Sequence, residues 1–506
     1  MHCRFYILVI VSWASSFLYA TDYNIGDFGA LRNQLSTTSI QKAIDTCFAS
    51  GGGRVVIPAG KFIIGALILK SRVELHLAPG SILEASLNLD DYKIAGRTYG
   101  MVFCEDATQV AITGSGTIKA NGILFYETDK NHTYPEFDRN QIRQKDQYMP
   151  EGIFTPDGPL KRKPRPGMTL VFFHCTDVKL TGITIEDTPV WAIRFGYCES
   201  VLVDGITILN NPLIPNSDGI HCTASRNIRI SNCHIVAGDD AIILTGFDKI
   251  ENVPDYNTSE QASHEYGNKS IYAENISVTN CQLKSTSAGI RIGYGQHPIR
   301  RGIFSNIIIY DSHRGIGIFA HDKSDIEDLI FSDITIETRL YNGQWWGNGE
   351  PIHLSCISRF EGVKAGQIKN VQFNNIIATG EQGILVYGLK ESQMENIQFN
   401  NVQLKMRRGK ETMTYGGNFD VRPATPRHLQ LFEHDIPGLY AQHVNGLSIR
   451  NFNLQWGRDL PSFFTHGIQC EEVSDLFIDA FNGGPNPNAA GGKKLFLKNT
   501  TFSKTK

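Results

Sequence analysis

Apolar and polar residues alternate along most of this chain after residue 50, in short runs that Gly, Asn or Asp interrupts. A period of two residues is typical of β-strands that bury one face. The runs recur at spacings of roughly 20 to 30 residues, and each is expected to bend at the interrupting residue and resume as a second short strand. Because such repeats bury one continuous core when they stack, the pattern predicts a parallel β-helix rather than a propeller or a sandwich. From Val110 the runs are VAITGSGTI, VKLTGITIEDT, VLVDGITILNN, IRISNCHIVA, ISVTNCQLKS, IIIYDSHRGI, LIFSDITIET, VQFNNIIATG and IQFNNVQLK.

Asparagines recur at the bends of these runs, at Asn232, Asn280, Asn374 and Asn400. Asparagine side chains commonly hydrogen-bond to backbone groups in turns. We therefore expect an asparagine ladder that satisfies the turn backbone and has no catalytic role.

The segment before the repeats predicts a cap for one end of the stack. Ser39 to Phe48 has the spacing of a short amphipathic helix with Ser39 as its N-cap. Three short strand segments follow it, GRVVIPAGKF, GALILKS and VELHLAPGSIL. A helix at this point would cover the exposed strand edge that a solenoid otherwise leaves open.

The chain divides into a leader and one long domain. Residues 1–20 have an early Arg4, an apolar run and small residues before a cut after Ala20, which predicts a secretory signal peptide and a secreted or periplasmic protein. Residues 21–506 are expected to form a single β-helix domain. Polar insertions near 122–167 and 247–270 interrupt the repeats, and such loops often build a cleft on one face of a solenoid.

Composition narrows the class of protein. A net charge of −3 over 506 residues gives no reason to expect nucleic acid or an anionic membrane as a partner. Cys175, Cys198 and Cys222 lie 23 and 24 residues apart, which suits inward-facing buried thiols better than disulfides. No CxxC pair or His cluster has zinc-ligand spacing. We therefore expect a monomer without a membrane span, a metal ion or a cofactor.

Three carboxylates in the stretch from Asn216 to Thr245 carry the chemistry of the sequence. Asp218, Asp239 and Asp240 each lie beside a glycine and a short apolar run, and Asp218 and Asp239 are 21 residues apart. In a coiled β architecture that spacing places them on neighbouring turns, about 4.8 Å apart between backbones. Carboxylates so crowded cannot all ionise freely, so one should be a proton donor while the others stay charged.

That division of protonation suits hydrolysis of a glycosidic bond, in which one acid protonates the leaving oxygen and a base activates water. Asp239 and Asp240 are consecutive, so in a regular strand they would face opposite sides. Both can reach one cleft if the chain bends at Gly238. Two other interpretations stay open, a calcium site built from the same carboxylates and solvated aspartates in turns.

The motifs NSDGIH at 216–221 and GDDAI at 238–242, preceded by DFGA and GGGRVVIPAGKF, resemble those of glycoside hydrolase family 28, the polygalacturonase and rhamnogalacturonase family. The resemblance covers roughly residues 22 to 405. It implies a right-handed parallel β-helix and inverting hydrolysis of pectic polysaccharides. Carried over by motif, Asp239 is the general acid, and Asp218 and Asp240 hold and activate the water. Asn216 and Gly238 shape the site, and His221 stands where plant-type members also have His. Asn216 and His221 are therefore expected to bind substrate.

The chain departs from the family pattern in two places. The stretch SAGIRIGY at 287–294 has Ala288 where polygalacturonases have the histidine of a GHG motif, and RGIGIFA at 314–320 lacks the Arg and Lys of an RIK motif. Arg291 and Arg314 could bind a carboxylate from another angle, because a guanidinium holds it bidentately, although surface salt bridges are the competing role. With Tyr294 they are the predicted substrate-binding residues here. A rhamnogalacturonan-type or decorated pectic oligosaccharide then fits better than plain homogalacturonan, and the large insertions favour a blocked pocket and exo action.

Adjacent tryptophans lie in the glycine-flanked loop YNGQWWGNGEP at 341–351. Trp345 and Trp346 suit stacking on the face of a sugar, and packing inside a buried loop is the alternative.

Two other classes of function remain possible from the sequence. A polysaccharide lyase or uronate epimerase shares the β-helix fold, but a lyase needs a Lys or Arg base and usually calcium. A non-catalytic carbohydrate-binding β-helix is the third hypothesis, since the fold alone implies no chemistry. The intact set of three aspartates favours the hydrolase, whereas the missing histidine and cations favour the binder.

Overall fold

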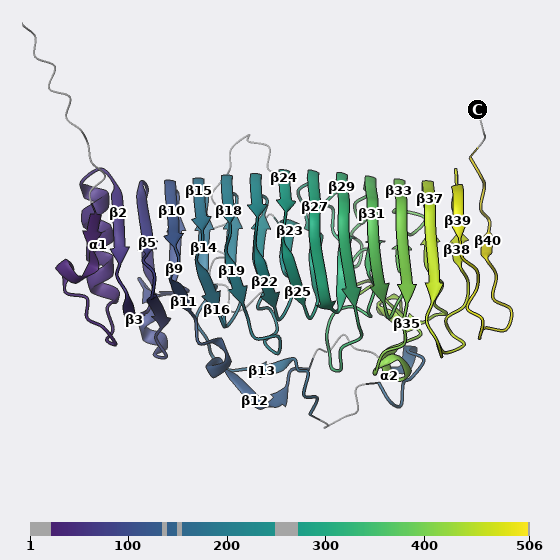
Figure 1. The fold of residues 1–506 in the computed structure, drawn as a ribbon, viewed down its shortest axis with the longest axis horizontal. Coiled ribbons are helices and arrows are strands. Elements are labelled where there is room, and N and C mark those ends of the chain that lie inside the picture. The colour runs from purple at the N-terminus through teal and green to yellow at the C-terminus, as the bar shows by residue number, and fades with distance from the viewer. Residues whose placement is uncertain (1–21, 134–138, 149–153, 248–271, 504–506) are drawn as a thin grey trace, which may run out of the picture.

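The computed structural model describes residues 22–133, 139–148, 154–247 and 272–503. The predicted signal peptide and most of the insertion near 247–270 lie outside these residues. Within them the chain winds into a long stack of parallel strands, with helix α1 at one end and strand β40 at the other (Figure 1). The predicted right-handed parallel β-helix is confirmed.

Two parallel sheets form the walls of the stack. The shorter wall, here called sheet B, has 13 strands in the described residues, in an order that follows the chain. Each of its strands pairs with the next turn of the coil, so that Ile193, Ile220 and Ile242 are in register on three successive turns. Its strands are β4 Leu67–Leu69, β9 Val102–Glu105, β14 Leu170–Phe173, β17 Ile193–Gly196, β20 Ile220–Thr223, β23 Ile242–Gly246, β26 Ala288–Gly295, β28 Arg314–Ala320, β30 Ile352–Cys356, β32 Ile384–Tyr387, β36 Leu439–Gln442, β38 Ile468–Glu471 and β40 Leu495–Lys498.

The longer wall, sheet A, has 21 strands in the described part of the chain. Its N-terminal turns carry two short strands each, as the repeats predict. From β27 onward each turn has one strand of 13 or 14 residues until β37. The strands are β1 Asp22–Asn24, β2 Gly53–Ile57, β3 Gly60–Ile64, β5 Val73–Leu77, β6 Ser81–Ala85, β10 Thr108–Gly114, β11 Thr117–Lys119, β15 Thr176–Thr181, β16 Thr184–Glu186, β18 Glu199–Asp204, β19 Thr207–Leu209, β21 Arg226–Ser231, β22 His234–Ala237, β24 Ala273–Thr279, β25 Gln282–Ser285, β27 Ile299–Ser312, β29 Ile326–Thr338, β31 Ile368–Gly380, β33 Met394–Met406, β37 Val444–Trp456 and β39 Phe477–Asn482.

The prediction that each run divides into two short strands is therefore wrong for the later turns. At the bend a single Asn or Asp takes the left-handed conformation, as at Asp333 (φ 57°) and Asn401 (φ 56°), and the strand continues through it. Asparagine and aspartate tolerate this conformation better than most residues do. One such residue therefore turns the strand without ending its pairing with the next turn.

The asparagine ladder is present, but the partners of its side chains differ from those expected. The Asn400 amide donates to the Asn374 side-chain oxygen at 2.9 Å, and Asn280 donates to Asn232 at 3.3 Å. The amides therefore bind one another from turn to turn rather than the turn backbone.

The capping helix is confirmed with a corrected start. Helix α1 spans Thr37–Ala49, and its N-cap is Ser36 rather than Ser39. Ile40 N–H donates to the Ser36 carbonyl at 2.9 Å, while the Ser36 hydroxyl donates to the carbonyls of Leu31 and Gln34. Ser39 lies in the first turn, because the hydrogen bond from Ile40 N–H to the Ser36 carbonyl closes that turn at Ser36. Buried Ile40, Ile44 and Cys47 face the first turns of the stack.

Stacked apolar side chains fill the space between the walls. Phe304, Phe331, Phe373 and Phe399 lie on successive turns with ring centroids 4.7 to 5.0 Å apart. The nine cysteines of the described residues are buried thiols without disulfide bonds, which confirms the prediction for Cys175, Cys198 and Cys222. No helix in the described ranges is long and apolar enough to cross a membrane.

Several short elements leave the stack on one side, below the strands in Figure 1. The antiparallel hairpin of β12 (Tyr126–Asn131) and β13 (Leu160–Arg162) comes from the first insertion. Helix α2 (Thr412–Tyr415) and the pair β34 (Asn418–Asp420) and β35 (Leu431–Glu433) come from the connection between β33 and β36. A third pair, β7 (Lys93–Ile94) and β8 (Arg97–Thr98), lies nearer the N-terminus.

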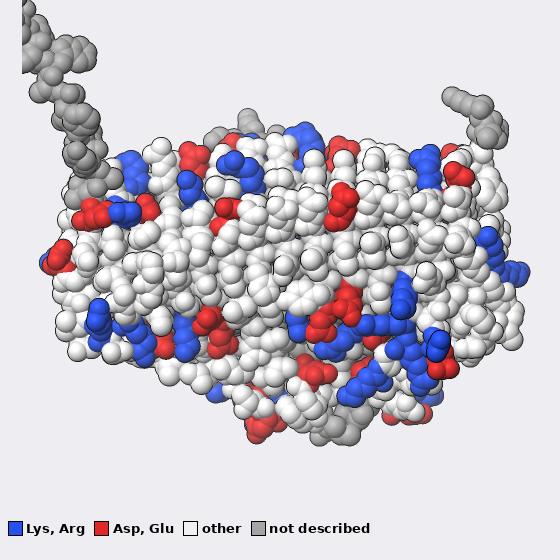
Figure 2. All heavy atoms as spheres, viewed as in Figure 1, with Lys and Arg blue, Asp and Glu red and all other residues white. Residues whose placement is uncertain are grey.

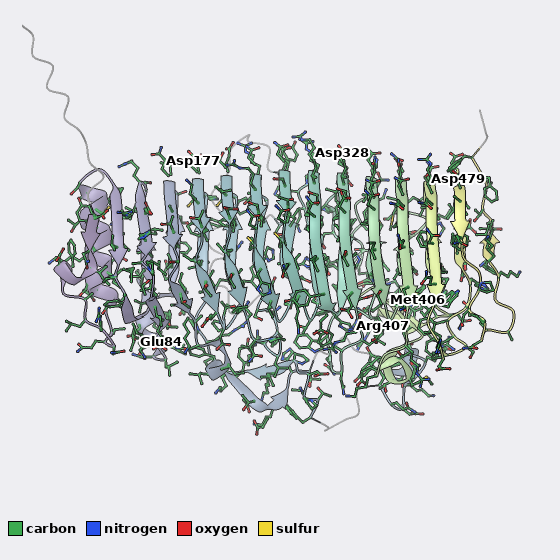
Figure 3. All side chains as sticks on the ribbon, in the orientation of Figure 1. Glu84, Asp177, Asp328, Met406, Arg407 and Asp479 are labelled. Atoms are coloured by element: carbon green, nitrogen blue, oxygen red, sulfur yellow. The ribbon has the colours of Figure 1, made fainter. Side chains whose placement is uncertain are left out.

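Charged side chains gather along the two edges of the stack. On the face that Figure 2 shows, a broad middle band is almost free of charge, and Lys, Arg, Asp and Glu lie above and below it. Figure 3 places Asp177, Asp328 and Asp479 at the upper edge, and Glu84, Met406 and Arg407 at the lower one. The loops that build the candidate site leave the stack at this lower edge.

Candidate active site

The three predicted aspartates come together at the point where two adjacent turns enter sheet B. Asp218 lies two residues before Ile220 on β20, and Asp240 lies two residues before Ile242 on β23. Ile220 and Ile242 are register partners, and Gly219 N–H donates to the Asp240 carbonyl at 2.9 Å. The stacking therefore puts the aspartates on neighbouring turns as predicted, but Asp218 aligns with Asp240 rather than with Asp239, which lies 21 residues after it.

The bend expected at Gly238 is present between β22 and β23. A Cβ atom at Gly238 would lie 2.3 Å from the Ile214 carbonyl oxygen and 2.5 Å from the Ser217 hydroxyl. Only glycine allows this approach, and the Gly238 N–H uses it to donate to the Ser217 hydroxyl at 3.0 Å. Since residues 238–241 lie outside a regular strand, Asp239 and Asp240 can both face one pocket.

Backbone amides hold Asp239 in place. Asn216 has a left-handed backbone (φ 58°), and its N–H donates to Asp239 Oδ2 at 3.1 Å. The Asn216 side-chain amide lies 3.4 Å from the same oxygen, and Asp240 N–H donates to Oδ1 at 3.0 Å. Asn216 therefore positions Asp239, which agrees with its predicted role in shaping the site.

Asp240 is paired with a cation instead. Its Oδ2 accepts a hydrogen bond from Arg291 Nε on β26, and its Oδ1 accepts one from Ala288 N–H at 3.0 Å. Ala288 thus contributes only its backbone where the family motif has a histidine. The guanidinium of Arg291 also lies over the Tyr294 ring, 4.7 Å from its centroid.

Burial raises the pKa of two of the three carboxyl groups. Asp218 and Asp239 are 2 and 7% exposed. Burial, followed by the neighbouring Asp240 charge, raises the pKa of Asp239 to about 7. Burial and the charges of Asp239 and Asp240 also raise the pKa of Asp218 well above its ordinary value. The site therefore holds an acid that keeps its proton near neutral pH beside a carboxylate that an arginine neutralises.

These groups line a pocket of about 210 Å³. Its walls include Trp191, Tyr294, Phe319 and Trp346, so that aromatic rings surround the carboxyl groups. Trp345 does not reach it: the side chain is 2% exposed, and its indole N–H donates to the Asp157 carbonyl at 2.9 Å. Of the two adjacent tryptophans, the structure therefore brings only Trp346 to the pocket.

Four arginines of the described residues line the same pocket, and a carboxylate holds each one. Arg291 pairs with Asp240, and Arg314 Nε lies 3.4 Å from Glu350. The other two pairs are Arg359 with Asp322 and Arg422 with Asp420, both at 2.6 Å. A guanidinium fixed from behind in this way loses little freedom when it binds an anionic group in front.

Arg359 and Arg422 were not predicted from the sequence. They lie after β30 and β34, far along the chain from the acidic motifs, and neither belongs to a repeating run. A signal was present in DVRP at 420–423, where an acid and an arginine two residues apart can pair before a proline. Nothing in its spacing relates it to Asp218 or Asp239.

His221 lies behind Asp218 rather than in the pocket. It is fully buried, and its Nδ1 is 3.3 Å from Asp218 Oδ2. Its ring stacks on Trp191 with centroids 3.7 Å apart. His221 therefore does not line the pocket, in contrast to its predicted role in binding substrate.

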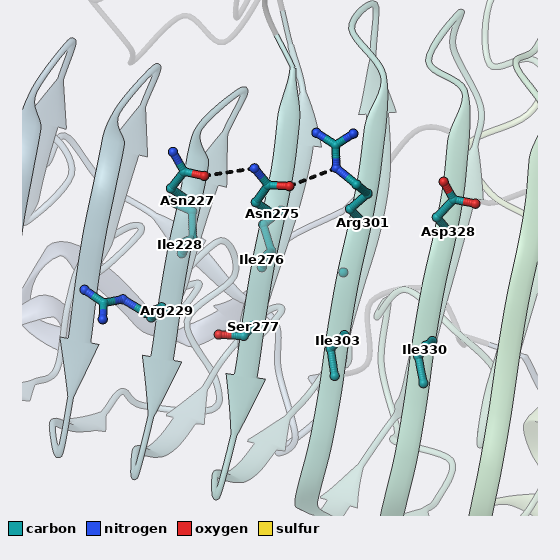
Figure 4. Close-up of a pocket in the computed structure, with 11 residues that line it drawn as sticks. Asn227, Ile228, Arg229, Asn275, Ile276, Ser277, Arg301, Ile303, Asp328 and Ile330 are labelled. Carbon is teal, nitrogen blue, oxygen red and sulfur yellow. Dashed lines mark hydrogen bonds between the residues drawn. The ribbon is translucent and has the colours of Figure 1, made fainter.

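A larger hollow of about 540 Å³ lies elsewhere, on the outer face of sheet A (Figure 4). Asn227, Asn275 and Arg301 form a row of hydrogen bonds along its rim, and Ile303 and Ile330 are exposed within it. Asp328 is the only carboxylate among its lining residues. This groove therefore lacks the grouped acids that a hydrolytic site needs.

The calcium interpretation has little support from the same contacts. An arginine and a backbone amide already occupy both oxygens of Asp240, and amides occupy those of Asp239. A calcium ion needs six to eight oxygen ligands and would repel the arginine. Among the described residues, no group of three or more His, Cys, Asp or Glu is arranged to hold a metal ion.

Residues 155–320, which contain the three aspartates, match the family model described as Glycosyl hydrolases family 28. A probable polygalacturonase from Vitis vinifera is 26% identical over 264 residues, which cover 48% of this chain and 48% of that protein. An endo-polygalacturonase from Pectobacterium parmentieri is 23% identical over 66% of this chain and 87% of its own length. The chain thus spans about half the length of the Vitis vinifera relative.

Among solved structures, the family 28 exopolygalacturonase of Yersinia enterocolitica has the same fold, with a TM-score of 0.62 and 18% identity over 96% of this chain and 79% of that one. The family-model match over residues 155–320 and the sequence relatives support membership of glycosyl hydrolases family 28, and the solved structure shows the shared fold.

Proposed function

We propose that this protein hydrolyses a glycosidic bond in a pectic polysaccharide or oligosaccharide, with inversion at the anomeric carbon. The observation that carries this proposal is the grouping of Asp218, Asp239 and Asp240 in one pocket, with an acid of raised pKa beside an arginine-paired carboxylate. Inverting hydrolysis requires one acid and one base, and the pocket supplies Asp239 for the first role and Asp218 for the second.

In this mechanism Asp239 transfers its proton to the glycosidic oxygen as the bond to the anomeric carbon breaks. Water attacks the anomeric carbon from the opposite face and gives its proton to Asp218. Asp240, which pairs with Arg291, stabilises the positive charge that develops on the sugar ring. The products are two sugars with new hydroxyl groups, and the protein regains its starting state after one proton moves from Asp218 to solvent and another returns to Asp239.

The arginines support a substrate that carries carboxylates. Arg291, Arg314, Arg359 and Arg422 all present guanidinium groups to a pocket that also contains three acids. Uronic acid units of pectin have such a carboxylate on each ring, and the relatives are named polygalacturonases. Bidentate pairing with a fixed guanidinium would orient the ring over Asp239.

Exo action follows if the pocket accepts only the end of a chain. Trp346, Arg422 and Pro423 reach the pocket from two segments outside the repeats, and Arg422 lies over the Trp346 ring at 5.2 Å. Together they would close one end of the groove that runs along a β-helix. A saccharide could then enter only by its terminus.

The first test is product analysis on homogalacturonan and rhamnogalacturonan oligosaccharides of defined length. The proposal expects new reducing ends, inverted anomeric configuration by NMR and release of one unit at a time from a chain end. Products that absorb in the ultraviolet through a new double bond would identify a lyase instead. Binding without any product would favour the carbohydrate-binding hypothesis.

Replacing Trp346 by alanine is expected to raise KM for an oligosaccharide about tenfold, because a stacked aromatic contributes roughly 0.5 to 1.5 kcal/mol. Internal cleavage products should also appear as the pocket end opens. The matched control is Trp345→Phe, since Trp345 is adjacent but buried outside the pocket. An equal rise of KM in both variants would mean that Trp346 acts through loop packing rather than through contact with the sugar.

The rate should fall at alkaline pH. Asp239 must be protonated to act as the acid, and its pKa is raised to about 7. As pH rises through that value the proton is lost, so kcat/KM should decrease about tenfold per pH unit at higher pH. A pH profile of kcat/KM measures this directly. An alkaline limb that begins below pH 5 would place the essential acid on an ordinary exposed carboxyl group.

A further inference from the structure

His221 belongs to a chain of hydrogen bonds that runs inward from the pocket. Its Nδ1 is 3.3 Å from Asp218 Oδ2, and its Nε2 is 3.2 Å from the Thr245 hydroxyl. Thr245 in turn lies 3.3 Å from the Thr223 hydroxyl. These residues come from the adjacent strands β20 and β23, where Thr223 and Thr245 are register partners. The sheet itself therefore determines the order Asp218, His221, Thr245, Thr223.

The imidazole in this chain is neutral and has one N–H to give. Burial, followed by the positive charges of Arg291 and Arg194, lowers the pKa of His221 well below its ordinary value. Each threonine hydroxyl has one proton to donate and can also accept. With Thr223 donating to Thr245, the Thr245 hydroxyl donates to Nε2, and the ring proton lies on Nδ1, facing Asp218. Trp191 stacks on the ring and prevents it from turning.

The two carboxylate oxygens of Asp218 have different surroundings. Oδ2 faces His221, whereas Oδ1 is buried and has no hydrogen-bond partner among the described residues. A buried oxygen of this kind normally binds water. Because Asp218 lines the pocket, Oδ1 is the oxygen available to a water molecule there.

We propose that His221 is a positioning residue that donates its Nδ1 proton to Asp218 Oδ2, keeps Asp218 ionised and leaves Oδ1 to accept the proton of the attacking water. This inference rests on the proposed hydrolytic function. Thr245 acts one step further away by selecting the tautomer that places the proton on Nδ1. The role explains why a fully buried histidine, which cannot touch the sugar, lies directly behind a carboxyl group.

The proposed hydrogen bond from His221 lowers the pKa of Asp218, whereas most of the neighbouring groups raise it. Burial and the charges of Asp239 and Asp240 raise the pKa of Asp218, and Arg291 lowers it. The ionisable groups that act on Asp218 and His221 are Arg194 from β17, Asp239 and Asp240 from the bend, and Arg291 from β26. A hydrogen bond to the charged form adds to the effect of Arg291.

Two substitutions at His221 separate the two ring nitrogens. Asparagine places an amide N–H near the position of Nδ1, and glutamine places one near Nε2. We expect His221→Asn to keep kcat within about threefold, and His221→Gln to lower it roughly 10- to 100-fold with KM unchanged. In His221→Gln the acidic limb of kcat/KM should move up by about one pH unit, since Asp218 loses a donor to its charged form. Thr245→Val should shift the limb in the same direction by less.

Equal losses in the asparagine and glutamine variants, with the limb unmoved, would overturn the proposal and leave His221 a packing residue. A limb that moves down would show that Asp218 is the donor and His221 the acceptor, which also overturns the proposal.

A second measurement needs no substrate. It compares the thermal stability of wild type and His221→Gln across pH 4 to 9, each with and without Asp218→Asn. The stability lost in His221→Gln should grow as pH rises and disappear in the Asp218→Asn background. If the wild type cleaves no pectic substrate but the pH-dependent coupling is present, the proposed hydrolytic function is wrong and the proposed hydrogen bond from His221 to Asp218 is still supported.

Discussion

Replacing Asp239 by asparagine is expected to lower kcat by about three orders of magnitude while the protein stays folded, because loss of a general acid typically costs 10²- to 10⁴-fold. An asparagine amide can occupy the same space but cannot give a proton to the leaving oxygen. Asn216 N–H donates to one oxygen of Asp239 and Asp240 N–H to the other, so the amide oxygen of the variant can accept one of these two hydrogen bonds. The measurement is steady-state turnover on the oligosaccharide that the wild type cleaves, with thermal unfolding recorded in parallel.

Asp187→Asn is the matched control for this substitution. Asp187 is also a carboxyl group whose pKa is raised by burial, and it accepts hydrogen bonds from Ile123 N–H. It lies outside the pocket, so its replacement should leave kcat unchanged. Near-normal turnover in Asp239→Asn would remove Asp239 from the role of acid, and an equal loss in both variants would indicate a general effect of buried carboxyl groups on the fold.

Replacing Arg291 by glutamine should have the second large effect, on stability and on rate together. Arg291 and Asp240 are 9 and 3% exposed and pair directly. Removing one partner of a buried ion pair leaves an uncompensated charge and typically costs about 3 to 5 kcal/mol. We therefore expect the free energy of unfolding to fall by several kcal/mol and kcat to fall at least tenfold, since Asp240 loses the side chain that pairs with it and holds it in place.

The double variant Arg291→Gln with Asp240→Asn tests the origin of that loss. With no charge left to bury, a large part of the stability should return, while activity stays low because both groups of the site are gone. Chemical unfolding of the wild type, the two single variants and the double variant gives the coupling energy. Additive losses in the double variant would mean that the two side chains contribute independently and that their contact is incidental.

The alternation of apolar and polar residues was sufficient to predict the wall of strands, because each inward-facing residue is marked by its own neighbours in the chain. The same local information predicted the capping helix and the buried thiols, and the NSDGIH and GDDAI motifs predicted the position of the acids. It failed at the later bends, where Asp333 and Asn401 turn the chain without ending a strand. Whether a strand continues depends on pairing with the adjacent turns, which no single run contains.

What the sequence determined by itself is therefore the repeating coil and the two adjacent turns on which the three aspartates lie, since residues one repeat apart in the chain lie on neighbouring turns of the stack. Only the tertiary structure decided which other groups meet those acids. It brought Arg359 and Arg422 to the pocket from loops without periodicity, turned Trp346 inward and Trp345 away, and placed His221 behind Asp218. The arginine and tryptophan contacts depend on the packing of segments more than 100 residues away from the aspartates. Packing over such separations follows from shape and burial rather than from any local pattern.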